Sequence, residues 1–249
     1  MAMDPVLGRR DVLKGTMAIG AGLAASGWAV PGLAQGLPGP LQSPGVQPAG
    51  APLPPGAAVP GMAPVSPAAA LPTSPVGTPE YNRRILANAK RQVERLGSKL
   101  WRTDVVGMAD FSRPSWEPRM HFANLENGTV RSFLLAHGKG SDLDHTGWLQ
   151  TFSSQYGSLA TSRGAYLTCE WYTGKYGTSI RLVGLDPDNR TALERMIVMH
   201  SAWYVDPGMI AKWGKIGRSD GCFAMSQTDF NEALWHLSGG RLLFADRIV

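Results

Sequence analysis

The stretch MIVMHSAWYV at residues 196–205, followed by GKIGRSDGCFAM at 214–225, carries the strongest chemical pattern of the chain. The apolar run 197–199 predicts a strand that ends at His200, and the chain then has enough length to fold back to Cys222. A thiol is mostly protonated at neutral pH, so a nucleophilic cysteine needs a base within reach and an electropositive pocket. The pattern therefore predicts Cys222 as nucleophile and His200 as its base.

Backbone groups beside this pair fit the same chemistry. Gly221 lets the main chain approach a ligand closely, and the amides of Gly221 and Cys222 are candidates to bind a developing oxyanion. The carbonyl of Ser201 is expected to orient the ring of His200.

Two other interpretations of Cys222 remain open. A free cysteine often packs as a small apolar core residue. A disulfide between Cys169 and Cys222 is the second alternative, because an oxidising compartment favours disulfides. Cys169 shares one face of a predicted strand with Leu167 and Trp171, which favours a core position for Cys169.

The composition predicts three regions. Residues 1–34 have Arg9-Arg10 before a short Gly/Ala-rich apolar stretch, which predicts a twin-arginine export signal, delivery to the periplasm and membrane contact only during export. The alternative is a membrane anchor, but the apolar stretch is short and glycine-rich for a bilayer span. Residues 35–79 hold most of the 19 prolines and no charged side chain, so they predict an extended linker. Residues 80–249 are expected to form the folded domain.

The net charge of +5 favours a polyanionic neighbourhood such as a cell wall, a membrane surface or nucleic acid. Nucleic acid is the weakest of the three, because the basic residues are scattered and no nucleic-acid-binding signature is present.

The folded region predicts a mainly β domain with packed helices. Thr78 and Pro79 begin a predicted helix that Gly97 ends. Alternating apolar residues, with turns at 127–128 and 174–177, predict two hairpins and further strands. The strands are predicted at residues 105–111, 120–125, 129–136, 166–173, 179–185, 195–200 and 241–245. A second helix is predicted at 227–236, capped by Ser226 with Asp229 as its capping-box partner.

These motifs resemble the L,D-transpeptidase catalytic domain, whose pattern is a strand, His-Ser or His-Gly, a loop and Ser-x-Gly-Cys. The upstream stretches FLLAHGKGS, GSLATSRGAYLTCEW and GTSIRLVGLDPDN extend the resemblance to a proteobacterial branch described as murein L,D-transpeptidase catalytic domain-like. The resemblance covers roughly residues 103–249. It implies a β-sandwich catalytic domain that needs no metal and no cofactor.

The resemblance implies that Cys222 attacks a peptidoglycan stem peptide and that the resulting thioester passes to an amine on a neighbouring stem. His200 would serve as general acid and base. The resembled branch is associated with cross-links from L-alanine to diaminopimelate, a 1,3-type product, whereas common members make the 3,3-type.

The chain departs from the common family pattern in two places. Asp220 stands where common members have His, and Phe223-Ala224 replaces Ile-Arg or Leu-Asn. We expect Arg218 to supply the missing positive charge and to pair with Asp220.

Further residues are candidate substrate contacts. Aromatic side chains suit a peptide groove, although in a strand-rich domain they are more often core. The loop containing His137 is interpreted as structural or substrate-facing, with a loose metal site of His137, Asp142, Asp144 and His145 as its alternative. The candidate substrate-binding set is Arg218, Ser219, Asp220, Tyr172, Trp203, Tyr204 and His137.

Two other functions fit the sequence. An exported cysteine peptidase or amidase would use the same nucleophile and base but transfer the acyl group to water. A non-catalytic wall-binding module on a proline-rich linker would make His200 and Cys222 incidental.

Overall fold

The computed structural model describes residues 74–248; the predicted export signal and nearly all of the predicted linker lie outside them. Within the described part, three α-helices and eight strands form a mainly β domain, which confirms the predicted fold class. The helices are α1 (Pro79–Leu96), α2 (Pro207–Trp213) and α3 (Gln227–His236). The strands are β1 (Val105–Asp110), β2 (Met120–Asn124), β3 (Thr129–Phe133), β4 (Gly164–Gly174), β5 (Gly177–Gly184), β6 (Val198–Ser201), β7 (Phe223–Met225) and β8 (Leu242–Asp246). No helix in this part is long and apolar enough to cross a membrane.

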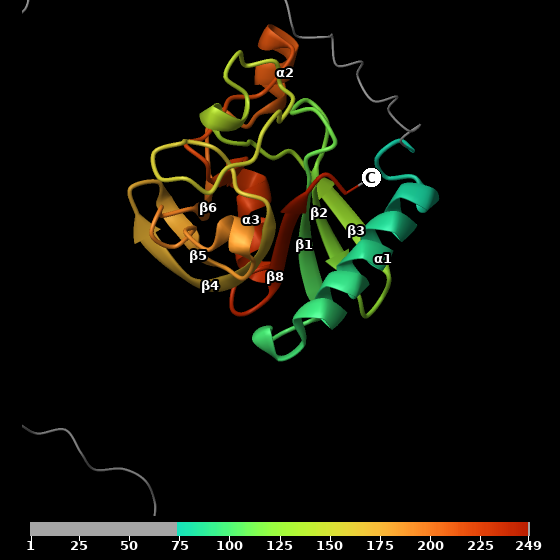
Figure 1. Ribbon diagram of the computed structural model, residues 1–249. Coiled ribbons are helices and arrows are strands. Elements are labelled where there is room, and N and C mark those ends of the chain that lie inside the picture. The colour runs from blue at the N-terminus through green and yellow to red at the C-terminus, as the bar shows by residue number, and fades with distance from the viewer. Residues whose placement is uncertain (1–73, 249) are drawn as a thin grey trace, which may run out of the picture. The chain divides into compact units, whose positions relative to one another are not determined.

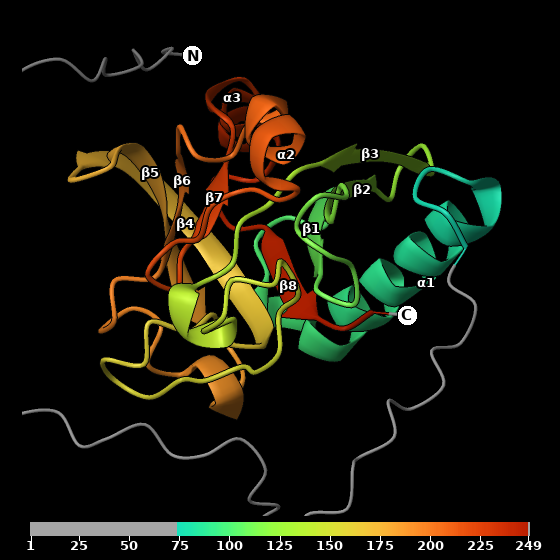
Figure 2. The same ribbon diagram turned by 90° about the horizontal axis from the view of Figure 1, so that it is seen from above.

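The strands form one continuous sheet in the order β3-β2-β1-β8-β4-β5-β6-β7. The β1–β8 and β6–β7 pairs are parallel, and the other neighbours are antiparallel. The sheet curves strongly, so that β1–β3 and β4–β7 form two walls joined through β8 (Figures 1 and 2). The layers expected of a sandwich thus come from one bent sheet.

Helix α1 covers one face of this sheet (Figure 1). Its first residue follows the predicted cap, since the hydroxyl of Thr78 accepts a 3.3 Å hydrogen bond from the amide of Tyr81. Gly97 follows its last residue with φ 51°, a left-handed value that favours glycine. The helix buries its apolar stripe against alternate residues of β1 and β8, including Val106 and Phe244.

The opposite face of the sheet encloses the larger core. Here the other alternating residues of β1 and β8, such as Val105 and Leu243, meet Phe223 of β7 and Phe230 of α3. This core supports β6 and β7 from within, so the ends of those two strands are held in place.

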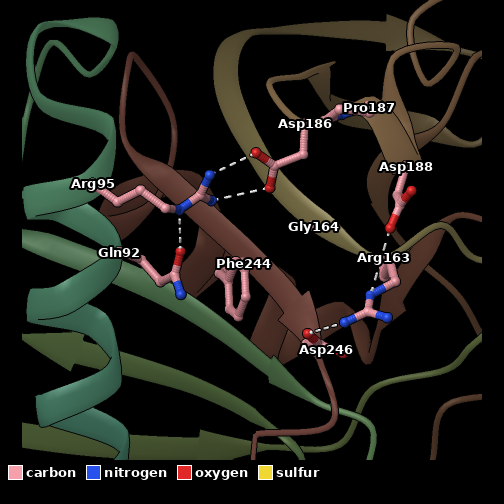
Figure 3. A pocket seen from close by; sticks show the side chains of 9 residues that line it. All are labelled: Gln92, Arg95, Arg163, Gly164, Asp186, Pro187, Asp188, Phe244 and Asp246. Atoms are coloured by element: carbon pink, nitrogen blue, oxygen red, sulfur yellow. Dashed lines mark hydrogen bonds and ion pairs between the residues drawn. The ribbon is translucent and has the colours of Figure 1, made fainter.

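Ion pairs surround a cavity of about 330 Å³ between α1 and the sheet (Figure 3). Arg95 of α1 makes a bidentate pair with Asp186, with N–O distances of 2.7 and 3.0 Å. Arg163 pairs with Asp246 at 2.8 Å and with Asp188 at 3.8 Å. Because these charges already have partners, we interpret the cavity as a structural junction.

The structure corrects several predicted boundaries. Strand β3 ends at Phe133, not at residue 136, and β6 begins at Val198, because Met196 has a left-handed φ of 56° that interrupts an extended strand. Helix α2 and strand β7 were not predicted. The amide of Asp229 donates to the hydroxyl of Ser226 at 3.1 Å, which confirms the cap of α3.

Candidate active site

Strands β6 and β7 place the predicted base and nucleophile beside each other. His200 pairs with Ala224 in the parallel register, and Cys222 directly precedes β7. Continuing the register by one residue puts Cys222 opposite Val198, two positions before His200. Neighbouring strands are separated by about 4.8 Å and each residue rises about 3.3 Å, so the two Cα atoms are about 8 Å apart. At this Cα separation the side chains of Cys222 and His200, on the same face of the sheet, are able to meet.

The Cys222 thiol is buried and protonated in this arrangement. Its side chain is 5% exposed, and the thiol donates a 3.7 Å hydrogen bond to the carbonyl of Met196. Burial raises the pKa of the Cys222 thiol, and Asp220 adds to the rise, whereas a hydrogen bond from the backbone of Val198 and the charge of Arg195 oppose it. In the described residues the sulfur makes no hydrogen bond to His200, so a proton transfer from the thiol to the imidazole would require the thiol to turn away from Met196.

The ring of His200 is held in one tautomer. Its Nδ1 lies 2.8 Å from the carbonyl of Ser201, which can only accept, so Nδ1 carries the proton and Nε2 is the basic nitrogen. Burial lowers the pKa of His200, and the Ser201 carbonyl only partly offsets this effect. The imidazole is therefore neutral at neutral pH, the form that takes up a proton. The ring of Tyr176, from the β4–β5 turn, stacks on it with centroids 4.4 Å apart.

A tight turn presents the thiol. The hydroxyl of Ser219 donates a 2.6 Å hydrogen bond to the carbonyl of Cys222 and accepts one of 3.2 Å from the amide of Gly221. Gly221 has φ 114°, and a Cβ there would lie 2.8 Å from the carbonyl oxygen of Ala160. Only glycine fits this position without strain. The Gly221 amide, a predicted oxyanion donor, is thus occupied by Ser219 in the free protein.

A cavity of about 120 Å³ opens beside this turn. It brings together five of the predicted site residues, but the buried Cys222 is not among the residues that line it. The lining residues are Lys139, Tyr176, His200, Tyr204, Arg218, Ser219 and Asp220.

The charges of the pocket have other partners than predicted. Asp220 pairs with Lys139 at 3.1 Å, not with Arg218. Arg218 instead donates to the backbone carbonyls of Asp142 and Leu143, the latter at 3.2 Å. Since those carbonyls anchor its guanidinium, Arg218 borders the pocket without neutralising Asp220.

Arg195 supplies a positive charge that acts on the thiol. Its guanidinium lowers the pKa of Cys222, and it would lie 3.3 Å from a Cβ on Gly221. Four hydrogen bonds to the 153–162 loop fix it, among them one of 2.7 Å to the carbonyl of Ala160. The prediction that Arg218 fills this role is therefore not supported by the geometry.

His137 is buried and does not line the pocket. It is 1% exposed, with Nδ1 2.7 Å from the buried guanidinium of Arg119 and Nε2 3.3 Å from Asp142. Burial, with the charge of Arg119, lowers the pKa of His137 and keeps the ring neutral. The backbone of His137 supports the turn that precedes Cys222, because the carbonyl of His137 accepts a 2.9 Å hydrogen bond from the amide of Ser219.

The residues of the alternative metal site do not gather into one cluster: His137 and Asp142 contact each other, whereas His145 has a different partner. His137 and Asp142 belong to the Arg119 network, while His145 lies 3.0 Å from the carbonyl of Ile216. Among residues 74–248, no three side chains of the metal-binding types come together.

Two aromatic candidates lie outside the pocket. Tyr172 packs under the guanidinium of Arg181, 4.6 Å from the ring centroid. Trp203 is 82% exposed and makes an edge contact with Tyr204, which does line the pocket. The two cysteines are both free, so the disulfide alternative is wrong.

The sequence interpretation missed three contributors to the site. Lys139 follows His137-Gly138, Tyr176 sits in the predicted hairpin turn, and Arg195 precedes the strand of His200. The proximity of Arg195 to that strand was a usable signal. The positions of Lys139 and Tyr176 depend on contacts between distant segments.

Comparison with known proteins gives a family match. A model described as L,D-transpeptidase catalytic domain matches residues 78–245. An L,D-transpeptidase from Mycobacterium smegmatis is 15% identical, with 57% of this chain and 58% of that chain covered and a TM-score of 0.36. A mutant of the helical cell shape determining protein Pgp2 from Campylobacter jejuni is 13% identical, with coverages of 66% and 56% and a TM-score of 0.36. The chain thus covers less than two thirds of either relative's own length. No curated protein sequence matches it.

Proposed function

Because the chain belongs to the L,D-transpeptidase catalytic domain family, we propose that it cross-links peptidoglycan stem peptides through a thioester on Cys222. The observation that carries this proposal is the β6–β7 register, which sets His200, with its free Nε2, diagonally across from Cys222 beside a small polar pocket.

The first half-reaction makes the acyl-enzyme. The thiol leaves the Met196 carbonyl and transfers its proton to Nε2 of His200, and the thiolate attacks the stem-peptide carbonyl. The tetrahedral intermediate collapses as the carbon–nitrogen bond breaks, and the imidazolium returns its proton to the departing amine. A thioester on Cys222 and a neutral His200 remain.

The second half-reaction reverses these roles. An amine of a neighbouring stem peptide attacks the thioester, and Nε2 of His200 takes its proton. The carbon–sulfur bond breaks, and the proton returns to the sulfur. A new amide then joins two stems.

We propose a 1,3-type product, in which L-alanine is joined to diaminopimelate, formed in the periplasm after twin-arginine export. The support for the linkage is the resemblance of the motifs to the branch associated with it. The support for the compartment is the sequence of residues 1–34.

Defined muropeptides test the proposal. The protein is incubated with donor and acceptor stems, and products and protein are analysed by mass spectrometry. We expect an acyl adduct on Cys222 and a cross-linked dimer, and neither with Cys222→Ala. If Cys222→Ala cross-linked stems at the rate of the unmutated protein, the proposal would be wrong.

The same experiment separates the alternative functions. Release of the free donor acid without a dimer, dependent on Cys222, would indicate the peptidase or amidase. Binding to sacculi by both proteins, with no adduct and no product, would indicate the wall-binding module.

A further inference from the structure

A second cavity lies where α1 leads into the sheet. Its volume is about 480 Å³, and it shares no lining residue with the active-site pocket. Figure 1 shows the C-terminal end of α1 at the opposite end of the domain from α2, which follows the Tyr204 wall of the active site. The lining residues are Trp101, Arg102, Thr103, Asp104, Glu126 and Arg241.

The indole of Trp101 is exposed and packs on the backbone of Gly240. The side chain is 71% exposed. One side of it rests on Gly240, where an added Cβ would come within 2.5 Å of Trp101 Cε3 and 2.6 Å of Trp101 Cβ. The carbonyl of Gly240 also accepts hydrogen bonds from the amides of Trp101 and Arg102, at 2.9 and 3.0 Å. The glycine backbone thus supports the ring and leaves apolar surface free for a ligand.

Hydrogen bonds also hold the polar groups beside the ring in place. Arg241 is 7% exposed and forms a bidentate pair with Asp104, at 2.8 and 2.6 Å. A third nitrogen of Arg241 donates to the carbonyl of Ser238 at 2.9 Å. Arg102, Thr103 and Glu126 complete the rim with exposed donors and acceptors.

The charge of the cavity selects a class of ligand. Two guanidinium groups and two carboxylates line it, so their formal charges cancel. A net positive site would be expected for phosphate, nucleic acid or an anionic lipid surface. This cavity therefore suits a neutral ligand that is apolar on one face and rich in hydroxyl and amide groups at its edge.

We propose that the cavity binds carbohydrate, namely a segment of neutral N-acetylated amino sugar in a glycan strand. A pyranose ring presents C–H groups on its faces and polar groups around its edge, matching an aromatic platform with planar charged groups beside it. Within the proposed function, on which the choice of glycan rests, this site holds the strand while Cys222 acts on its stem peptides.

Calorimetric titration with a linear N-acetylglucosamine hexamer tests the site. The unmutated protein binds the hexamer, and Trp101→Ala weakens binding at least tenfold. Trp235→Ala is the matched control, because that indole is 83% exposed on α3 and does not line the cavity. Replacing Arg102 with Ala and Glu126 with Gln together weakens binding several-fold while leaving the ring in place.

Three outcomes would overturn the proposal: no hexamer binding, equal binding by Trp101→Ala, or equal losses in Trp101→Ala and Trp235→Ala. Cys222→Ala separates the two proposals, since it abolishes cross-linking and leaves hexamer binding unchanged. Loss of cross-linking on intact sacculi by Trp101→Ala, with normal rates on short soluble muropeptides, is the expected functional result. Tighter binding to anionic vesicles than to the hexamer would identify a membrane surface instead.

Discussion

The imidazole of His200 lies stacked on the phenol ring of Tyr176, with centroids 4.4 Å apart and planes inclined by 17°. Tyr176 belongs to the turn between β4 and β5, whereas His200 ends β6. The ring restricts access of water to the base and limits its rotation, while the carbonyl of Ser201 fixes its tautomer. A side chain from a hairpin turn thereby helps to position the proposed base.

Replacing Tyr176 with Ala is expected to hydrate the imidazole. Burial lowers the pKa of His200, so greater exposure raises it towards its ordinary value of 6.5. Because the neutral imidazole accepts the thiol proton, activity will be lost at a higher pH on the acid side of the pH–rate profile. We also expect kcat to fall roughly tenfold through looser positioning. Tyr176→Phe keeps the stack and should retain the original profile; an identical shift in both variants would contradict the stacking argument.

Ser219→Ala removes both hydrogen bonds that shape the nucleophile turn. The hydroxyl bridges the carbonyl of Cys222 and the amide of Gly221. We expect kcat to fall about ten- to a hundredfold with little change in the melting temperature, since small misplacement of reacting atoms is costly. Ser238→Ala is the control, because its hydroxyl also donates to a backbone carbonyl but lies outside the pocket. Equal rates for the two variants would show that the turn holds its shape without Ser219.

Gly221→Ala is expected to destabilise the domain more than Gly157→Ala. Both positions have positive φ, 114° and 74°, so alanine costs about 1–2 kcal/mol at each from backbone strain. Only at Gly221 does the added Cβ meet backbone, 2.8 Å from the Ala160 oxygen, and overpacking adds about 1–3 kcal/mol. Urea unfolding of the two variants measures the difference. An equal decrease in the free energy of unfolding for both variants would mean that the backbone around Gly221 shifts to accommodate the added Cβ without cost.

Arg195→Gln is expected to slow alkylation of the thiol. The positive charge of Arg195 lowers the pKa of Cys222, so its removal raises that pKa and reduces the thiolate fraction at any given pH. The rate of iodoacetamide labelling against pH should shift to more alkaline values. Arg181→Gln, a change at an exposed arginine paired with Glu170, serves as control. A shift to lower pH for Arg195→Gln would contradict the electrostatic assignment.

The domain should lose stability as the pH falls below about 6.5. Burial lowers the pKa values of His121 and His137, so below about pH 6.5 the unfolded chain binds more protons than the folded domain does. The free energy of unfolding then decreases with falling pH, by up to about 1.4 kcal/mol per pH unit for each histidine. Thermal unfolding at pH 7, 6 and 5 measures this slope. A stability that rose on acidification would refute the buried, neutral state of both rings.

Several features of the fold could be read locally. The start and end of α1 follow from Thr78, Pro79 and Gly97, because caps and left-handed glycines act within a few residues. The turn at 174–177 was predicted for the same reason, since its glycines pair at the end of the hairpin. Strand β7 escaped prediction because its three residues are too few to show a period.

The sequence by itself determined the mainly β class and the first helix, because residue type and short-range periodicity express these directly. It also predicts the pair of Cys222 and His200 that the proposed chemistry uses. The tertiary structure alone decided that Lys139 pairs with Asp220, that Arg195 lies near the thiol, and that Cys222 is hydrogen bonded to Met196. These contacts depend on strand register and on loops packed from distant parts of the chain. No local sequence pattern specifies which charged side chains pair, since these residues are far apart in the chain and meet only in the folded domain.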